Sequence, residues 1–171
     1  RARPLQHEEY PMKITFADPA RPAKGVAVVF VLEGGKWTET GALLDKKTKG
    51  ALRRAAKAAK FTGKKGQELT VLAPTGTSLD RVLAVGLGNA DGIDAKILNE
   101  AGGAIQAALA KHTASADIHV DEIKKSPLDT SKMAAEIAYG AELRSYRFDK
   151  YRTREKAENK PTLKGLTIRV P

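Results

Sequence analysis

Short apolar runs alternate with longer amphipathic segments along the chain, which predicts strands separated by helices. The most apolar run is 25–32, which is hydrophobic at every position after its first glycine. A strand that is apolar on both faces is typical of the centre of a sheet covered on each side. Further strands are expected at 13–17, 68–73, 81–87, 116–120 and 166–170.

Three segments show the helical spacing of apolar positions. The first is 45–60, which stops at Thr62 and Gly63, and the second is about 95–111, capped by Asp94. The third begins at Thr130 or Ser131, either of which could cap it. One broad face of the second helix carries Ile97, Leu98, Ala101, Ile105, Ala108 and Leu109.

Two glycines interrupt that second helix. Gly102 and Gly103 each cost about 1 kcal/mol relative to alanine in a helix interior. We therefore expect them to allow a close approach of the helix to the sheet.

The elements follow the order β, β, α, β, β, α, β, α, β. This order predicts an α/β fold with a mixed, mostly parallel sheet of about six strands and helices on both faces. Residues 74–80 form a hairpin-like connection, and 151–163 are expected to be an exposed loop. Residues 1–11 contain no apolar stretch and are interpreted as an expression remnant, which leaves 12–171 as the domain.

Three aromatic residues lie at the end of the third helix, at Tyr146, Phe148 and Tyr151. Neighbours on a helix are three or four residues apart, so the three rings cannot share one line. Phe148 and Tyr151 are expected to share a face and anchor the helix end in the core, whereas Tyr146 points elsewhere.

The formal net charge of +10 is concentrated in one stretch, because nine basic residues and no acidic one lie between Lys46 and Lys65. A solvated helix face is one interpretation, and phosphate contact without base reading is the other. The candidate nucleic-acid contacts are Lys46, Lys47, Lys49, Arg53, Arg54, Lys57, Lys60 and Lys64. A second basic cluster consists of Arg144, Arg147, Lys150, Arg152 and Arg154.

The residues needed for most catalytic sites are missing. There is no cysteine, which excludes disulfides and thiolate chemistry and agrees with a cytoplasmic location. The histidines His7, His112 and His119 are scattered and lack a recurring metal-ligand spacing. The glycine-rich loop 86–92 follows a strand and precedes a helix, but its spacing departs from the dinucleotide pattern. No run reaches the ~18 apolar residues of a membrane span.

A family resemblance appears at 140–153, which reads Gly-Ala-x-Leu-x-Ser-Tyr-x-Phe-Asp-x-Tyr-Arg-Thr. This stretch resembles the signature that ends the N-terminal domain of the leucine aminopeptidase (cytosol aminopeptidase) family. The matching positions are Gly140, Leu143, Tyr146, Phe148, Asp149 and Tyr151. Val85-Gly86-Leu87-Gly88 and Lys160-Pro161-x-Leu163 also fit, so the resemblance runs over about 12–171.

The resemblance implies a macro-domain-like, non-catalytic N-terminal domain of a cytoplasmic metal-dependent exopeptidase that favours leucine. It implies a homo-hexamer in which a C-terminal catalytic domain, outside this chain, holds two divalent metals (zinc, manganese or magnesium). No catalytic residue, metal ligand or cofactor site is therefore expected here. Some bacterial relatives bind DNA, which makes a nucleic acid the alternative partner. ADP-ribose binding rests on fold analogy alone.

Overall fold

The computed structural model describes residues 12–150 and 161–171, and for 147–150 it describes the backbone alone. The strands are β1 (Lys13–Ala17), β2 (Lys24–Leu32), β3 (Lys36–Trp37), β4 (Glu68–Leu72), β5 (Ser78–Gly88), β6 (Ser115–His119) and β7 (Gly165–Arg169). The α-helices are α1 (Glu39–Lys47), α2 (Ala51–Ala58), α3 (Ala95–Leu109) and α4 (Thr130–Lys150). A 3-10 turn, η1 (Ala90–Gly92), follows β5.

The strands form one sheet in the order β1-β7-β6-β2-β5-β4, with β3 paired to the end of β2. The neighbours from β1 to β5 are parallel, whereas β4 runs antiparallel to β5 and β3 antiparallel to β2. The predicted mixed, mostly parallel sheet is confirmed. The short β3 hairpin was not predicted, since its two residues are too few for a pattern.

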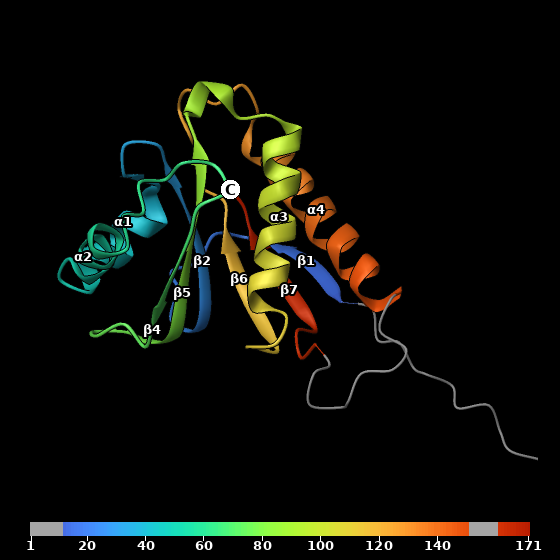
Figure 1. Cartoon of the computed structure of the whole chain (residues 1–171), viewed down its shortest axis with the longest axis horizontal. Coiled ribbons are helices and arrows are strands. Elements are labelled where there is room, and N and C mark those ends of the chain that lie inside the picture. Colours follow the sequence, from blue (N-terminus) through green and yellow to red (C-terminus); the bar gives the residue numbers. More distant parts are fainter. Residues whose placement is uncertain (1–11, 151–160) are drawn as a thin grey trace, which may run out of the picture.

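Helices cover both faces of the sheet, with α1 and α2 on one side and α3 and α4 on the other (Figure 1). The central strand β2 serves both layers. Its Val26, Val28 and Phe30 pack in the core beneath α3 and α4, and the alternate positions Ala27, Val29 and Val31 pack in the core beneath α1 and α2. Side chains alternate across a strand, so a strand between two helical layers must be apolar at every position.

The helix predicted over 45–60 is wrong in its bounds, because the structure breaks it into α1 and α2. Lys49 and Gly50 adopt left-handed backbone angles, with φ of 54° and 82°. Glycine takes such angles at little cost, which lets the chain turn there. The residues at the break are polar, so the helical spacing of the apolar residues on either side is not interrupted there. The apolar pattern therefore did not indicate a turn.

The close approach expected of Gly102 exists, but its partner is α4 and not the sheet. A Cβ atom at Gly102 would overlap the backbone carbonyl of Ile137. On the facing helix, a Cβ atom at Gly140 would overlap the backbone carbonyl of Asn99. At Gly103 a Cβ atom would lie 3.6 Å from the Gly140 oxygen, an ordinary contact. One glycine from each helix therefore brings the two backbones together.

The ends of several elements differ from expectation. The cap predicted at Thr130 or Ser131 is wrong, because Asp129 Oδ1 accepts the Lys132 N–H at 2.8 Å. The Asp94 cap is confirmed by its bond from the Ile97 N–H at 2.9 Å. The hairpin-like connection does join antiparallel strands, but its last residues, 78–80, already belong to β5. Of the loop expected over 151–163, residues 151–160 lie outside the described residues, and Leu163 is buried rather than exposed.

The aromatic helix end is described only in part. Tyr146 is 75% exposed, as expected for a ring that points away from the core. The side chain of Phe148 and the whole of Tyr151 lie outside the described residues, so their anchoring role stays a prediction.

Candidate functional site

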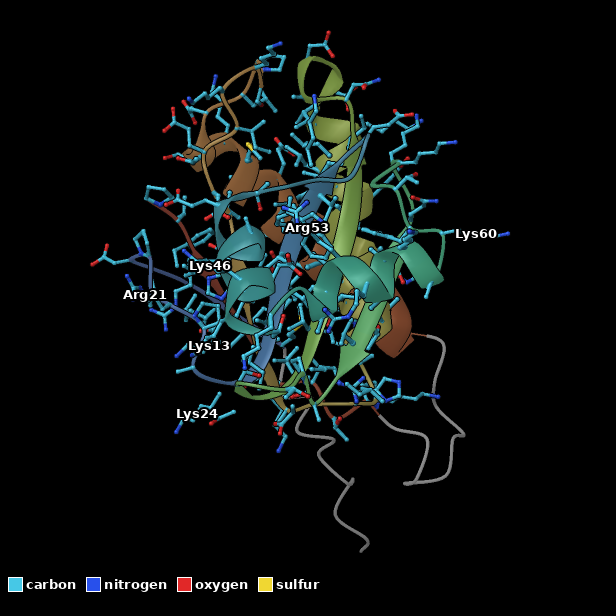
Figure 2. All side chains as sticks on the ribbon, turned by 90° about the vertical axis from the view of Figure 1, so that its left-hand side faces the viewer. Lys13, Arg21, Lys24, Lys46, Arg53 and Lys60 are labelled. Atoms are coloured by element: carbon cyan, nitrogen blue, oxygen red, sulfur yellow. The ribbon has the colours of Figure 1, made fainter. Side chains whose placement is uncertain are left out.

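The eight candidate nucleic-acid contacts lie on α1, α2 and the segments that follow each helix. All eight are exposed: Lys46, Lys47, Lys49, Arg53, Arg54, Lys57, Lys60 and Lys64. We call this set the basic layer. Figure 2 faces this side of the molecule, with Lys46, Arg53 and Lys60 spread across it and Lys13, Arg21 and Lys24 beside them. Because one layer carries these cations, a phosphate backbone could meet several at once.

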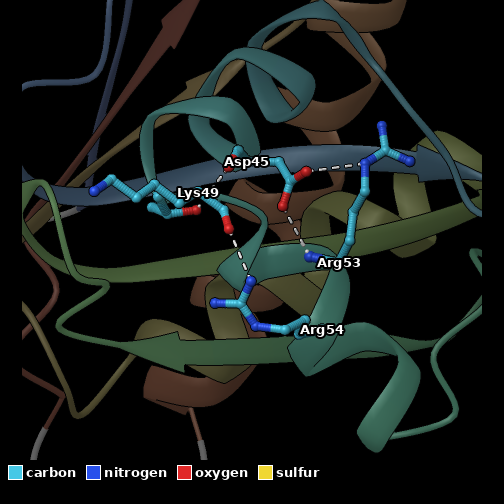
Figure 3. Close-up of polar contacts among 5 residues, drawn as sticks. Asp45, Lys49, Arg53 and Arg54 are labelled. Carbon is cyan, nitrogen blue, oxygen red and sulfur yellow. Dashed lines mark hydrogen bonds and ion pairs between the residues drawn. The ribbon is translucent and has the colours of Figure 1, made fainter.

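Two arginines of the basic layer also hold the layer together (Figure 3). The carboxylate of Asp45, which is 8% exposed, accepts the Arg53 N–H and the Arg53 Nε–H, each at 3.0 Å. The Arg54 Nη1 group donates to the Lys49 carbonyl at 2.8 Å. Asp45 therefore satisfies a backbone donor in the first turn of α2, where the N-cap residue Gly50 has no side chain to do so.

Only one member of the second basic cluster, Arg144, has a described side chain, and that residue does not extend the basic layer. Arg144 is exposed on α4, on the opposite side of the sheet from α1 and α2 (Figure 1). The side chains of Arg147 and Lys150, and all of Arg152 and Arg154, lie outside the described residues.

The histidines do not form a metal centre among residues 12–150 and 161–171. His112 is exposed after α3 and His119 is buried in β6, while His7 lies outside the described ranges. No group of three His, Asp or Glu side chains in these ranges could hold a metal ion. Likewise, no helix in the described ranges is long and apolar enough to cross a membrane.

His119 is buried beside charged neighbours. Its exposed fraction is 3%, and its Nε2 atom has no hydrogen-bond partner in the described part of the chain. Burial lowers the pKa of His119 below its ordinary value, the carboxylates of Asp117 and Asp121 oppose that shift, and Arg169 adds to it. The neutral imidazole is therefore favoured at neutral pH.

Asp121, just after β6, ties α1 to the sheet. Its carboxylate accepts the Thr40 N–H at 2.8 Å and the Thr40 hydroxyl at 2.7 Å. An acidic group at a helix N-terminus satisfies a free donor and complements the helix dipole. The contact between Asp121 and Thr40 was not predicted from the sequence. The only sign of it in the sequence is an acidic residue at the end of a parallel strand, where loops converge.

The place where α/β proteins commonly bind ligands is filled by this chain itself. The connections that leave β2 and β5 go to opposite faces of the sheet (Figure 1), and α/β proteins commonly bind ligands outside the carboxyl ends of such a strand pair. Here the segment 62–67 packs against the end of β5, with Gly88 N donating to the Gly63 carbonyl and Gly86 N to the Gln67 carbonyl, each at 2.9 Å. A Cβ atom at Gly86 would overlap the Lys64 carbonyl. The glycines at the end of β5, Gly86 and Gly88, therefore serve backbone packing.

Beside this segment lies a small hollow between β5 and α3, of about 40 Å³. Glu68, Glu100 and Lys65 contribute to its walls. Burial raises the pKa of Glu68 above its ordinary value. Pockets for cofactors and drug-sized ligands are commonly about 300–1,000 Å³. The hollow itself is too small for a nucleotide or ADP-ribose.

Comparison with known proteins places this arrangement in a family. Residues 28–155 match the model of the "Cytosol aminopeptidase family, N-terminal domain". The "Probable cytosol aminopeptidase" of Rhizobium meliloti (strain 1021) is 37% identical over 165 residues, covering 94% of this chain. That of Caulobacter vibrioides is 36% identical over 159 residues, covering 92% of this chain. In both cases the matched part is 31% of the relative's length.

Solved structures share the fold. A mutant of tomato leucine aminopeptidase superposes with a TM-score of 0.74 at 23% identity, covering 97% of this chain and 34% of that chain. The macrodomain of DarG from Mycobacterium tuberculosis gives a TM-score of 0.61 at 8% identity, covering 92% of this chain and 98% of that chain. The macro-domain-like architecture is confirmed.

The family match extends over most of the chain, and the sheet, its two helical layers and the signature helix α4 all agree with it. The chain spans about a third of the length of the curated relatives that it matches. This chain belongs to the cytosol aminopeptidase family and corresponds to its N-terminal domain.

Proposed function

We propose that this chain is the non-catalytic N-terminal domain of a metal-dependent leucyl aminopeptidase and serves its assembly or regulation. The observation that carries the proposal is the N-terminal-domain match over 28–155, together with relatives about three times as long. In this proposal, a following catalytic domain removes N-terminal amino acids with two divalent metals (zinc, manganese or magnesium). The whole protein is proposed to be a cytoplasmic homo-hexamer. Within the described ranges no side-chain group could hold a metal, which supports placing the chemistry elsewhere.

The first prediction concerns peptidase activity. The 171-residue chain with added Mn²⁺ or Zn²⁺ should not cleave leucine p-nitroanilide above background, because its described residues supply no metal-ligand set. A longer protein translated from the same reading frame, extended through a catalytic domain, should cleave the substrate under the same conditions. Turnover by the short chain that survives repurification and disappears in a point mutant of that chain would contradict the proposal.

A second candidate function is non-specific binding of nucleic acid by the basic layer. The observation that favours it is the exposure of all eight cations, which lie on α1, α2 and the segments that follow these two helices. Cations of this kind attract phosphates and carry no base specificity. If about four of them neutralise phosphates, the slope of log affinity against log salt should be roughly −3 to −4.

The second prediction is that reversing two of these charges flattens that slope. We choose Lys46→Glu with Lys60→Glu and leave Arg53 unchanged, because Arg53→Glu would place a second carboxylate beside that of the buried Asp45. The double variant should lower the steepness of the slope by about 2, as two phosphate contacts are lost. Affinity for a DNA duplex, measured by fluorescence anisotropy over a series of salt concentrations, gives the slope.

The matched control is Lys111→Glu with Lys132→Glu, two exposed lysines that lie outside the basic layer. Both double variants change the net charge equally. If both double variants weakened DNA binding equally, only the overall charge of the protein would matter. No binding by the unmodified chain at low salt would remove this second candidate.

A further inference from the structure

An exposed apolar stripe runs along α4. Tyr139 is 58% exposed, Leu143 39% and Tyr146 75%. They are spaced by four and three residues, so they lie along one line of the helix. They make up half of the large hydrophobic side chains that are exposed among the described residues. We call Tyr139, Leu143 and Tyr146 the α4 stripe.

The α4 stripe faces away from both the sheet and α3. The other side of α4 supplies Met133, Ala134, Ile137, Ala138 and Ala141 to the core beneath it. Gly102 and Gly140 bring the α3 and α4 backbones close together. The three side chains of the stripe therefore do not belong to the core of this domain. Contiguous exposed apolar groups with tyrosines are typical of a surface that binds another protein surface.

The charges around the stripe favour a protein partner over a polyanion. The charged neighbours on α4 carry both signs, with Lys132 and Arg144 against Glu136 and Glu142. The basic layer lies on the other side of the sheet (Figure 1). Among the side chains that the structure describes on α4, the stripe thus has apolar area without an excess of positive charge, which suits a protein surface.

The size of the stripe favours a partner that is covalently attached. Its exposed parts amount to roughly 400 Å², given the area that each aromatic side chain can bury. A stable association of separate chains commonly needs about 800 Å² from each partner. A patch of half that size is too small to hold a free second copy. It can suffice within one polypeptide, where a linker raises the effective concentration to the millimolar range.

We propose that the α4 stripe is the surface on which the following catalytic domain of the same polypeptide docks. This inference rests on the proposed function, which supplies that domain. The chain corresponds to the N-terminal domain of relatives about three times its length, so the tethered partner is a domain of the same protein. Its docking surface should be apolar, with groups of both charges at its rim.

Site-specific photocrosslinking in the full-length protein tests the docking surface. Tyr139→p-benzoylphenylalanine and Tyr146→p-benzoylphenylalanine place the reactive group on the stripe. Lys57→p-benzoylphenylalanine places it on α2, in the basic layer, as the matched control. Crosslinked peptides are mapped by mass spectrometry after co-assembly of isotopically light and heavy subunits, which separates links within one polypeptide from links between two.

The expected result is a link from 139 and 146 to residues beyond 171 of the same polypeptide, at least tenfold more abundant than any from 57. Links between light and heavy subunits would overturn the proposal in favour of a second copy. Equal or stronger links from 57 would overturn it too, as would no link from the stripe. If the reading frame encodes no catalytic domain, the proposed function falls as well. If the domain is present but does not link, only the docking inference falls.

Discussion

Gly102→Ala is expected to destabilise the domain by a net of about 2 kcal/mol. The added methyl group would overlap the Ile137 carbonyl, which is backbone and cannot rotate away. Overpacking of this kind costs about 3 kcal/mol at the upper end of its usual range, and the gain in helix propensity offsets about 1 kcal/mol of it. The unfolding free energy from urea titration, followed by circular dichroism, measures the change.

The neighbouring glycine provides the control. Gly103→Ala should stabilise the domain by up to about 1 kcal/mol, since its Cβ would lie 3.6 Å from the Gly140 oxygen without overlap. The two variants therefore differ by one position and should change stability in opposite directions. Stabilisation by both would mean that α3 and α4 are not held at this separation, and the account of their packing would be wrong.

Asp45→Ala is expected to cost about 2 kcal/mol, because it leaves the Arg53 N–H at the start of α2 without its acceptor and removes the partner of the Arg53 side chain. Asp45→Asn keeps one acceptor oxygen for the Arg53 N–H, but it replaces the oxygen that accepts from Arg53 Nε with an amide donor and loses the charge. It should cost about 1 kcal/mol less than the alanine variant. Urea midpoints at neutral pH give the comparison.

An independent variant isolates the ion pair. Arg53→Gln keeps the backbone N–H but removes the guanidinium, which is half exposed and so contributes only a few tenths of a kcal/mol. If Arg53→Gln proved as costly as Asp45→Ala, the side-chain pair rather than the cap would be the main support of α2.

The site was predictable only where a residue's role depends on its own chemistry. The eight cations of the basic layer were identified as a run and are exposed, because lysine and arginine rarely leave the surface. Asp45 and Asp121 gave no such sign. Each satisfies backbone donors that belong to another element, at Arg53 and Thr40, and that element's position is unknown until the chain has folded.

The sequence by itself determined the fold class and the family. The continuous apolar run of β2 required a covered central strand, and the alternation of strands and helices required a mostly parallel sheet. The signature at 140–153 indicated the family that the comparisons then confirmed. These inferences depend on local periodicity and residue identity, which are present in any single sequence.

Only the tertiary structure decided which surfaces meet. Gly102 could have approached the sheet or another helix, and the α3–α4 packing chose the helix. The glycines at the end of β5 could have cradled a phosphate, but the segment 62–67 packs against their backbone. Tyr139 and Tyr146 form an exposed stripe because α4 packs its small residues against the core on its opposite side. Glycine and tyrosine tolerate several environments, so their roles are fixed by neighbours that are distant in the sequence.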